Sequence, residues 1–414
     1  MVKMKDSGIE WIGEIPEDWN LIKLKYVSDV LYGYPLDSNL FSDEGFPMIR
    51  IRDITSGNIE TYYKGKFPKE YIISKGDILL GMDGDFNLRE WKNKDAVLNQ
   101  RCCKIWGSKI ALKKFLFYAL QKPLQVKNDI TYSTTVKHLL ADGINNLFFP
   151  LPNIDVQKKI ICYLDTKCTK IDSLKEDIEK QIETLEQYKK SVITEAVTKG
   201  ITPDVKMKDS GIDDFDKIPE SWNTKKIKFL FDLVADLNHL PMDKVQLLSL
   251  YTDLGVFPHG EQEERGNKAV TVEGYKKVKK NDLVVNIILA WMGAMGISKY
   301  DGVTSPAYDI YRPKSNNVNP KFYHYLFRTP WFAGECDKYG RGIMRMRWRT
   351  YSQEFMNIKI PFPSPKEQKE IADYLDSKCS AIDNIITTKE QQLEKLEEYK
   401  KSLIFEYVTG KREV

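Results

Sequence analysis

The strongest constraint on this chain is a run of eight residues that occurs twice. VKMKDSGI stands at residues 2–9 and again, letter for letter, at residues 205–212. With residue 2 placed on residue 205, a shift of 203, residues 2–27 align with residues 205–230 and also share an Ile-Pro-Glu and a Trp-Asn pair. A chain of 414 residues is too long for one ordinary core. We therefore predict an internal duplication in which each half buries a core of its own.

A second repeat lies at the other end of each half. With residue 150 placed on residue 361, a shift of 211, residues 150–198 match residues 361–409 without a gap and share YLD, a Lys-Cys pair, Ile-Asp and YKKS. The segments between the repeats, 28–149 and 231–360, are of similar length but share little. The order variable, constant, variable, constant indicates one scaffold that holds two differently specialised surfaces.

The constant segments at 150–198 and 361–409 have the pattern of long helices. Their apolar residues recur at steps of three or four that average close to 3.5, as in a coiled-coil seam. Prolines before the pattern and glycines after it limit each helix to roughly 40 residues, about 60 Å at 1.5 Å per residue. The predicted seam residues are Leu164, Ile171, Ile178 and Leu185 in the first helix, and Leu375, Ile382, Leu393 and Leu396 in the second.

Such a helix must bury its apolar stripe, because a single amphipathic helix is unstable alone in water. Each large apolar side chain that is fully buried contributes roughly 1.5–3 kcal/mol before other costs. The expected partner is the duplicate helix of the same chain, in an antiparallel pair. Packing of the stripes onto the variable segments, or onto a second chain, are the alternatives.

The variable segments have the pattern of strand-rich domains. FPMIRIRDIT, GDILLGM, CCKIW, LVVNIILAW and AYDIYR are short β-rich runs between turn residues, and helical pieces are expected near LKKFLFYALQ and PKFYHYLFRTPWF. The predicted fold class is therefore α+β: two globular, strand-rich domains in a pseudo-twofold arrangement, separated by an antiparallel coiled coil of two long helices.

Composition excludes several classes of protein. A hydrophobic content of 42% and a charged content of 29% are those of a globular protein, and no apolar run approaches the roughly 18 residues that span a bilayer. The N-terminal segment lacks the apolar core of a signal peptide, so we expect a cytoplasmic protein with no membrane partner. Six cysteines without a CxxC pair, and only four histidines, favour neither a disulfide framework nor a metal site.

The common catalytic motifs are missing from the sequence. There is no GxxxxGK[ST], HExxH or GxSxG, and no Asn-Pro-Pro-Tyr-type tetrad. GMDGD at 81–85 and MGAMG at 292–296 are interpreted as turns, and the vicinal pair Cys102 and Cys103 as buried strand residues. We predict no catalytic residue, no metal ligand and no cofactor.

One segment of the second half has the composition of a DNA-contacting loop. YGRGIMRMRWRTY at 339–351 contains arginines and aromatics without an acid. Arginines grip phosphates or the two acceptors of a guanine edge, and aromatics pack on sugars or thymine methyl groups. A solvated strand is the alternative interpretation. The predicted DNA-binding residues here are Arg341, Arg345, Arg347, Trp348 and Arg349.

The shift of 211 places this segment opposite ITYSTTVKHLL at 130–140, which also carries polar donors just before a constant helix. Two equivalent positions with different donors are what reading two different sequences would require. The net charge of +4 is only mildly basic, so the distribution of charge carries the argument. The remaining predicted DNA-binding residues are Thr134, Thr135, Lys137 and His138 in this segment, Arg50, Arg52, Arg89, Lys92 and Arg101 elsewhere in the first half, and Arg265 and Lys268 in the second.

This organisation resembles the specificity subunit of type I restriction-modification systems, over essentially the whole chain. Each long helix is introduced by a PLP…Q..I..YLD signature, here Pro150 to Asp165 and Pro361 to Asp376, and SGIEWIGEIPEDW with its copy SGIDDFDKIPESW is similar to the opening of that family's recognition domains. The first copy has NIDVQ where the second has SPKEQ, which leaves Gln157 and Gln368 aligned. The corresponding domains are target-recognition domain 1 at 1–150, spacer helix 1 at 151–200, target-recognition domain 2 at 201–363 and spacer helix 2 at 364–414.

The resemblance implies a non-catalytic subunit that binds double-stranded DNA at a bipartite target, one half-site per recognition domain. It also implies recruitment of two methyltransferase (M) subunits that use S-adenosylmethionine and, through them, of ATP-dependent translocase and nuclease (R) subunits. Two readers on a rigid spacer bind tightly only when their half-sites are correctly spaced. The expected spacing of half-site centres is about one helical turn, roughly 34 Å.

Two other classes of function are weighed against this one. A coiled-coil scaffold whose variable domains bind proteins would show no salt-dependent retention on DNA. A single-chain restriction or modifying enzyme would need the catalytic motifs that are missing.

Overall fold

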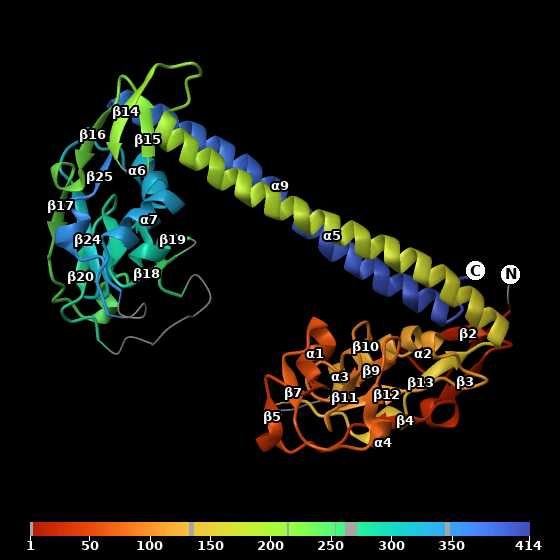
Figure 1. The fold of residues 1–414 in the computed structure, drawn as a ribbon. Helices are drawn as coiled ribbons and strands as arrows, with labels where there is room; N and C mark the ends of the chain where they lie inside the picture. Colours follow the sequence, from red (N-terminus) through yellow and green to blue (C-terminus); the bar gives the residue numbers. More distant parts are fainter. Residues whose placement is uncertain (1–2, 132–135, 213–214, 253, 261–270, 344–347) are drawn as a thin grey trace. The chain divides into compact units, whose positions relative to one another are not determined.

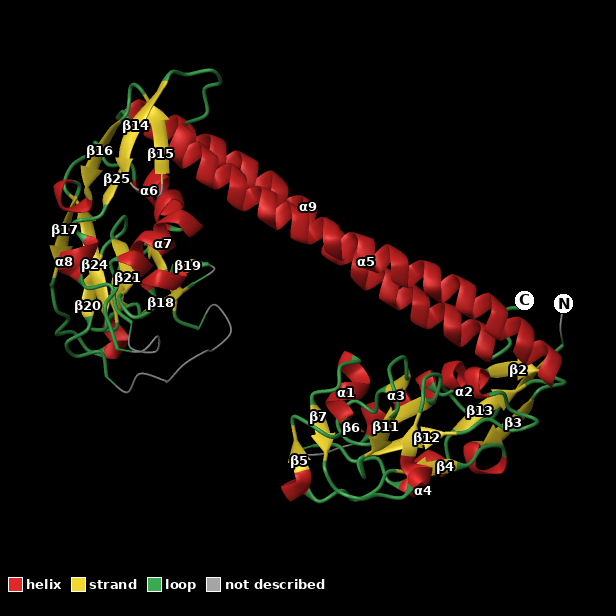
Figure 2. Ribbon diagram, in the orientation of Figure 1, coloured by secondary structure: helices red, strands yellow, loops and turns green. Residues whose placement is uncertain are grey.

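The protein, described by a computed structural model, contains two compact units (Figures 1 and 2). The structure describes residues 3–414 apart from 132–135, 213–214, 253, 261–270 and 344–347. The first unit comprises Met1–Ile178 with Gln391–Val414, and the second comprises Glu179–Glu390. Two long helices, α5 (Ile154–Lys199) and α9 (Pro365–Val408), contribute to both units. Among the described residues, no helix has the length and apolarity needed to span a membrane.

The first unit is built on two sheets. Their strand orders are β10-β9-β12-β4, all antiparallel, and β5-β7-β6-β11-β8, in which β6 and β11 are parallel. Strands β9 and β12 are buried along their whole length, so the sheets enclose the core of this domain. The strands are β4 (Val30–Tyr32), β5 (Phe41–Ser42), β6 (Phe46–Ile49), β7 (Thr61–Tyr63), β8 (Ile72–Ile73), β9 (Ile78–Gly81), β10 (Leu88–Glu90), β11 (Ala96–Leu98) and β12 (Cys102–Ile105).

Short elements complete the first unit around these sheets. Two antiparallel pairs, β1 (Met4–Asp6) with β2 (Glu14–Pro16) and β3 (Asn20–Lys23) with β13 (Phe148–Leu151), lie next to the ends of the long helices (Figure 1). The helical elements are η1 (Leu24–Tyr26), η2 (Ser38–Leu40), α1 (Ile51–Ser56), η3 (Lys69–Tyr71), α2 (Lys113–Ala119), α3 (Gln121–Ile130) and α4 (Ala141–Asn145).

The second unit repeats the four-stranded sheet of the first. Its order β22-β21-β24-β17 corresponds strand for strand to β10-β9-β12-β4, and it is also antiparallel. The strands are β14 (Met207–Ile212), β15 (Phe215–Pro219), β16 (Asn223–Lys226), β17 (Phe231–Val234), β18 (Leu248–Tyr251), β19 (Gly255–Pro258), β20 (Lys276–Val278), β21 (Leu283–Asn286), β22 (Met295–Ile297), β23 (Gly302–Thr304), β24 (Tyr308–Pro313) and β25 (Lys359–Phe362). The helical elements are η4 (Ile227–Phe229), η5 (Met242–Lys244), η6 (Ala290–Met292), α6 (Pro320–Phe327), α7 (Pro330–Lys338) and α8 (Ser352–Phe355).

The predicted α+β class, with a duplicated domain and two long helices, is confirmed, but two predicted strands are half wrong. LVVNIILAW forms β21 only as far as Asn286 and continues into a turn and η6. FPMIRIRDIT forms β6 only as far as Ile49, and its second half is the helix α1. Asp53 causes the change, because its carboxylate accepts a hydrogen bond of 2.8 Å from the backbone N–H of Arg50 and closes the first turn. Gly57, with φ at 73°, ends the helix in the left-handed region.

The long helices pack against each other in antiparallel directions within each unit. In the first unit, Lys400 donates to Asp172 at 2.6 Å and Lys175 donates to Glu397 at 2.6 Å. Moving forward along α5 from Asp172 to Lys175 therefore corresponds to moving backward along α9 from Lys400 to Glu397. In the second unit, Lys189 donates to Asp383 at 2.6 Å. The partner of each helix is therefore the duplicate helix of the same chain.

The ends of the helices also pack onto the strand-rich domains, which was one of the alternatives. Leu164 and Ile171 belong to the same core as Phe115 and Phe149 of the first domain. Leu375 belongs to the core of the second domain. Among the predicted seam residues, Leu164, Ile171, Leu375 and Ile382 are buried, whereas Ile178, Leu185, Leu393 and Leu396 are half-buried.

A buried glutamine forms the same joint between domain and helix in both units. The side chain of Gln157 accepts from the backbone N–H of Leu112 at 2.9 Å and donates to the backbone carbonyls of Ile110 and Pro152, both at 2.8 Å. Gln368 repeats these bonds with the backbones of Asn319, Asn317 and Pro363, at 2.8, 3.0 and 2.9 Å. Both glutamines are fully buried. Each joint is thus made to backbone atoms, two from the variable segment and one from the start of the constant segment.

A tyrosine and a carboxylate make a second contact at each joint. Tyr118 on α2 donates to Asp165 on α5 at 2.5 Å, and Tyr325 on α6 donates to Asp376 on α9 at 2.8 Å. Lys321 also donates to Asp376, at 2.6 Å. Burial alone would raise the pKa of Asp376, but the hydrogen bonds from Lys321 and Tyr325 hold this pKa below its usual value.

The repeated opening segments at 2–27 and 205–230 have a structural counterpart at the helix ends. Each long helix is followed by a glycine with positive φ, Gly200 at 80° and Gly410 at 71°. A Cβ atom at Gly410 would lie 3.2 Å from the ring of Trp19, and one at Gly200 would lie 3.3 Å from the ring of Trp222. The repeated opening segments therefore receive the ends of the two helices in the same way.

Candidate nucleic-acid interface

Two loops that carry predicted DNA-binding residues are attached at equivalent places in the two units. We define the first recognition loop as residues 131–140 and the second recognition loop as residues 339–351. In the first, the backbone N–H of Leu139 donates to the carbonyl of Met82, just after β9, at 2.7 Å. In the second, the N–H of Thr350 donates to the carbonyl of Ile287, just after the equivalent strand β21, at 3.0 Å. Each loop therefore lies beside the end of a buried central strand.

The first recognition loop brings two predicted residues together through a third. His138 Nδ1 lies 2.7 Å from Asp83 Oδ1, and Arg101 Nε lies 3.7 Å from Asp83 Oδ2. Because an ionised carboxylate only accepts hydrogen bonds, Nδ1 carries the hydrogen in this pair. The side chain of Asp83 is 18% exposed, whereas those of His138 and Arg101 are 52% and 57% exposed. Asp83 thus holds two half-exposed donors at one place.

Sequence reasoning missed Asp83 because it lies within GMDGD, which was interpreted only as a turn. An aspartate in a glycine-rich turn commonly bonds to its own backbone. Here the turn is bridged instead to the first recognition loop, since the N–H of Gly84 donates to the carbonyl of Lys137 at 3.0 Å. No local pattern indicates a partner 55 residues away.

Lys137 points its amine into the domain. It donates to the side-chain oxygen of Asn128 on α3 at 2.6 Å and to the carbonyl of the same residue at 2.9 Å. Asn128 in turn donates to the carbonyl of Gly84 at 3.3 Å. This lysine fastens the first recognition loop to α3 and to the turn that contains Asp83.

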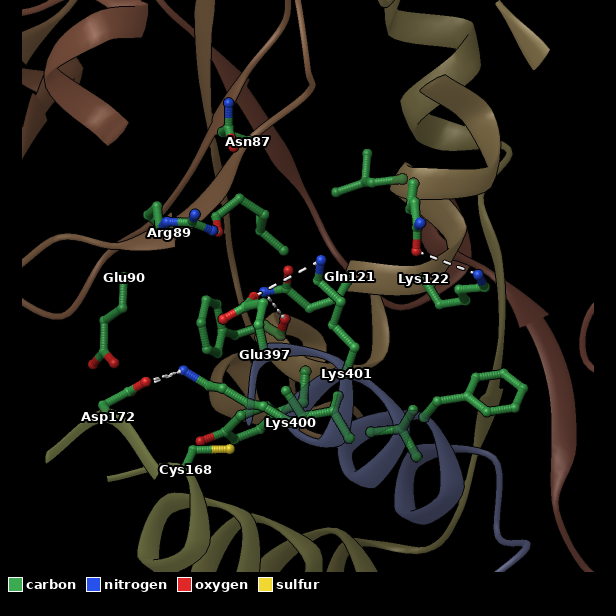
Figure 3. Close-up of a pocket in the computed structure, with 18 of the residues that line it drawn as sticks. Asn87, Arg89, Glu90, Gln121, Lys122, Cys168, Asp172, Glu397, Lys400 and Lys401 are labelled. Carbon is green, nitrogen blue, oxygen red and sulfur yellow. Dashed lines mark hydrogen bonds and ion pairs between the residues drawn. The ribbon is translucent and has the colours of Figure 1, made fainter. Parts of the chain in front are cut away.

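Other predicted residues of the first half lie apart from this cluster. Arg52 contacts Glu60 at 3.1 Å and the hydroxyl of Thr61 at 3.2 Å, and Arg50 provides the N-terminal cap of α1. Arg89 and Lys92 line a cavity of about 720 Å³ whose wall also includes Lys400 and Asp172 of the long helices (Figure 3). Among the described residues of the first-half set, Arg101 and His138 are therefore the ones whose side chains contact Asp83.

The second recognition loop is closed by two arginines. The backbone of Arg341 donates to that of Arg349 at 2.9 Å, and Arg349 donates back at 3.0 Å. The guanidinium of Arg341 is 73% exposed and lies 3.0 Å from the carboxylate of Glu354 on α8. Trp348 is half-buried, and its indole N–H donates to the carbonyl of Asp337 at 3.2 Å. Among the described residues of this loop, the exposed cationic side chains are thus Arg341 and Arg349, in contrast to His138 of the first loop.

Six of the predicted residues lie outside the part of the chain that the structure describes. They are Thr134, Thr135, Arg265, Lys268, Arg345 and Arg347. Within the described residues, no group of three or more His, Cys, Asp or Glu side chains is arranged to hold a metal ion.

Comparison with known proteins assigns a class to this architecture. The family model for the type I restriction modification DNA specificity domain matches twice, at residues 16–184 and 219–398. The chain belongs to this family, and its general role is recognition of a DNA target as the specificity subunit of a type I restriction-modification system.

Particular relatives agree over nearly the whole length. The chain is 29% identical to the EcoBI specificity subunit of Escherichia coli, over 92% of this chain and 83% of the relative. It is 27% identical to the MjaVIII specificity subunit of Methanocaldococcus jannaschii, over 96% of this chain and 93% of the relative.

Two solved structures share the fold at 14% identity. One is a chain from a type I R-M system, with a TM-score of 0.68 over 96% of this chain and 99% of that one. The other is the HsdS subunit from Thermoanaerobacter tengcongensis, with a TM-score of 0.51 over 96% and 98%.

Proposed function

We propose that this chain reads a bipartite DNA target, with one half-site for each recognition domain. The observation that carries the proposal is the equivalent attachment of the two recognition loops, at Met82 and at Ile287, with different side chains on each loop. A shared position gives both domains the same approach to the duplex, and different donors give each its own sequence. Base-edge contacts of this kind discriminate by about 1–3 kcal/mol each.

The chemistry of the two half-sites differs in this proposal. In the first, Asp83 presents His138 and Arg101 together, and the neighbouring Thr134 and Thr135 of the sequence add hydroxyl donors. In the second, Arg341 and Arg349 flank a loop whose sequence contains Arg345 and Arg347, so acceptors on guanine or on phosphates suit it. Phosphate contacts come from the other predicted residues, Arg50, Arg52, Arg89, Lys92, Arg265 and Lys268. Lys137 and Trp348 contribute to phosphate contacts indirectly, through the recognition loops that they support.

The proposal includes the partners of the chain. Two methyltransferase subunits that use S-adenosylmethionine bind the duplicated scaffold, one for each half, and the ATP-dependent translocase and nuclease subunits join through them. This chain supplies sequence recognition and no catalytic group. We expect the complex to be in the cytoplasm, because the DNA that it modifies or cleaves is there. The antiparallel pair of α5 and α9 keeps the half-site centres about one helical turn, roughly 34 Å, apart.

Methylation profiling of DNA from cells that carry this chain with its methyltransferase partner tests the proposal. The expected result is a split motif with an unread spacer. A second version of the experiment exchanges residues 28–149 for the variable segment of a relative, which is expected to change one half of the motif only. A continuous motif, or a change in both halves after the exchange, would contradict the bipartite reading.

A further inference from the structure

We propose that a basic turn repeated in both units is a DNA-phosphate grip that carries no sequence information. The basic turn comprises Lys23, Lys25 and Tyr26 in the first unit and Lys226, Lys228 and Phe229 in the second. The inference rests on the proposed function and deepens it, because it assigns to the constant part of each recognition domain a DNA contact separate from the recognition loops.

In the first unit, the basic turn presents charge and an aromatic ring to solvent. Lys25 is exposed, and its amine lies 5.2 Å from the ring centre of Tyr26, which is itself 67% exposed. Lys23 donates to the side-chain oxygen of Asn146 at 3.1 Å. An exposed aromatic beside an ammonium group is suited to a deoxyribose and its phosphate.

The second unit repeats this arrangement with a different set of neighbours. The amine of Lys228 lies 5.6 Å from the ring centre of Phe229, which is 63% exposed, and it donates to the side-chain oxygen of Asn357 at 3.0 Å. Phe229 and Lys226 also line an open hollow of about 470 Å³ together with Thr224, Lys225 and Lys359. All the charged side chains that line this hollow are lysines.

The positive charge of the basic turn is not neutralised by carboxylates. Within the described residues, Lys23, Lys25, Lys226 and Lys228 form no ion pair, and the amines of Lys23, Lys25 and Lys228 contact amide oxygens and aromatic rings. Some lysines elsewhere in the chain do have acidic partners, as Lys400 does in Asp172. An anionic ligand would therefore meet these amines without displacing a carboxylate.

In each unit the basic turn is bonded to the segment that follows the recognition loop. The N–H of Leu24 donates to the carbonyl of Leu147 at 3.0 Å, and the short helix α4 separates Leu147 from the first recognition loop. In the second unit, the N–H of Ile227 donates to the carbonyl of Ile358 at 3.0 Å, and α8 separates Ile358 from the second recognition loop. A duplex on either recognition loop thus extends past a short helix to the basic turn.

The duplication itself separates phosphate contacts from base contacts. Residues that read bases must differ between the copies, whereas residues that hold phosphates face the same chemistry in both half-sites. The basic turn is retained as KLKY and KIKF, immediately before the variable segments at 28–149 and 231–360 begin. Lys25, Tyr26, Lys228 and Phe229 are exposed, so burial in the core does not account for the retention of this lysine and this aromatic in both copies.

The test uses the complex of the full chain with its methyltransferase partner, a 40-base-pair duplex of arbitrary sequence and a duplex with the motif from methylation profiling. The variant carries Lys23→Gln, Lys25→Gln, Lys226→Gln and Lys228→Gln. Affinity for both duplexes is expected to fall by the same factor. The slope of log K against log salt is expected to become shallower by about 2–4, because each lost phosphate contact removes about 0.9. Replacement of the four lysines by arginine should restore the slope.

A matched control removes four other exposed lysines that are also retained in both copies, Lys3, Lys158, Lys206 and Lys369. It should keep the wild-type slope. An unchanged slope in the basic-turn variant, a loss confined to the target duplex, or release of the methyltransferase partner in gel filtration would each overturn the phosphate grip. A wild-type complex that shows no preference for the target duplex would instead overturn the proposed function, while the arbitrary duplex still reports on the grip.

Discussion

The amine of Lys400 donates to both carboxylate oxygens of Asp172, at 2.6 and 2.8 Å. A shift of 211 converts Asp172 into Asp383 and Lys189 into Lys400. The pair that results, Lys189 with Asp383, is also formed, at 2.6 and 2.7 Å. This reciprocity is the signature of an interface between two copies of one surface. Duplication of a single helix was therefore sufficient to create both sides of the contact.

These ion pairs contribute less stability than the seam. Because the side chain of Asp172 is half-exposed, Asp172→Asn is expected to lower the free energy of unfolding by less than about 1 kcal/mol. Leu164→Ala removes a fully buried side chain and should cost about 2–5 kcal/mol. Urea denaturation of the two variants measures both losses of stability. An equal or larger loss for Asp172→Asn would contradict the prediction.

Substitution of the buried glutamines Gln157 and Gln368 should lower the free energy of unfolding more than substitution of most other polar residues. Gln157→Ala leaves the backbone groups of Ile110, Leu112 and Pro152 without their partner, at an expected cost of about 2–4 kcal/mol. Gln368→Ala should cost a similar amount. Gln187→Ala, at an exposed position of α5, provides the control and should be nearly neutral. Thermal unfolding measures all three, and a neutral Gln157→Ala would show that the joint is dispensable.

Asp83 and Glu354 should affect opposite halves of the target. Asp83→Asn removes the carboxylate that holds His138 and Arg101, so binding to the first half-site is expected to weaken roughly tenfold or more, because a hydrogen bond to a charged group contributes about 1.5–3 kcal/mol. Glu354→Gln releases Arg341 and should affect the second half-site. Methylation rates on duplexes altered in one half at a time measure both effects. Equal effects on the two halves from either variant would count against this assignment.

The joint at Asp376 should make stability depend on pH in the acid range. The pKa of Asp376 is held below its usual value of 3.8, so the folded state binds this proton more weakly than the unfolded state. The stabilisation is therefore fully present above the usual pKa and is lost as the pH falls through the lowered one. Urea unfolding of wild type and Asp376→Asn from about pH 6 to about pH 3 should show a difference that shrinks toward acid. A difference that grows toward acid would show that the pKa of Asp376 is raised, not lowered, in the folded state.

The parts of the fold that could be predicted are those whose sequence contains a repeat or a periodic pattern of apolar residues. The helices α5 and α9 follow from apolar steps and flanking prolines, and their mutual pairing follows from the duplication. The helix α1 could not be predicted in this way, because the alternation in IRIRDIT favours a strand and the capping bond from Arg50 to Asp53 decides otherwise. Apolar steps alone also overestimate burial, because Leu174 and Ile385 lie at such steps and the structure leaves them 52% and 46% exposed.

The candidate site was predictable in position but not in detail. The shift of 211 aligned the two recognition loops, and the hydrogen bonds at Leu139 and Thr350 lie at aligned positions. The convergence of His138 and Arg101 on Asp83 depends on how β9, β12 and the loop fold together, and such long-range contacts leave no local pattern. The contact of Arg52 with Glu60 is likewise a property of the fold that no local pattern indicates.

The joint at Gln157 and Gln368 has a consequence for the history of such chains. Both glutamines bind backbone N–H and carbonyl groups of the variable segments, which every amino acid except proline supplies in the same form. The glutamine bonds can therefore form with a foreign segment inserted by recombination, whatever its side chains at these positions. New specificities can arise by cutting and joining whole segments of the gene, rather than by the slow accumulation of matched point changes.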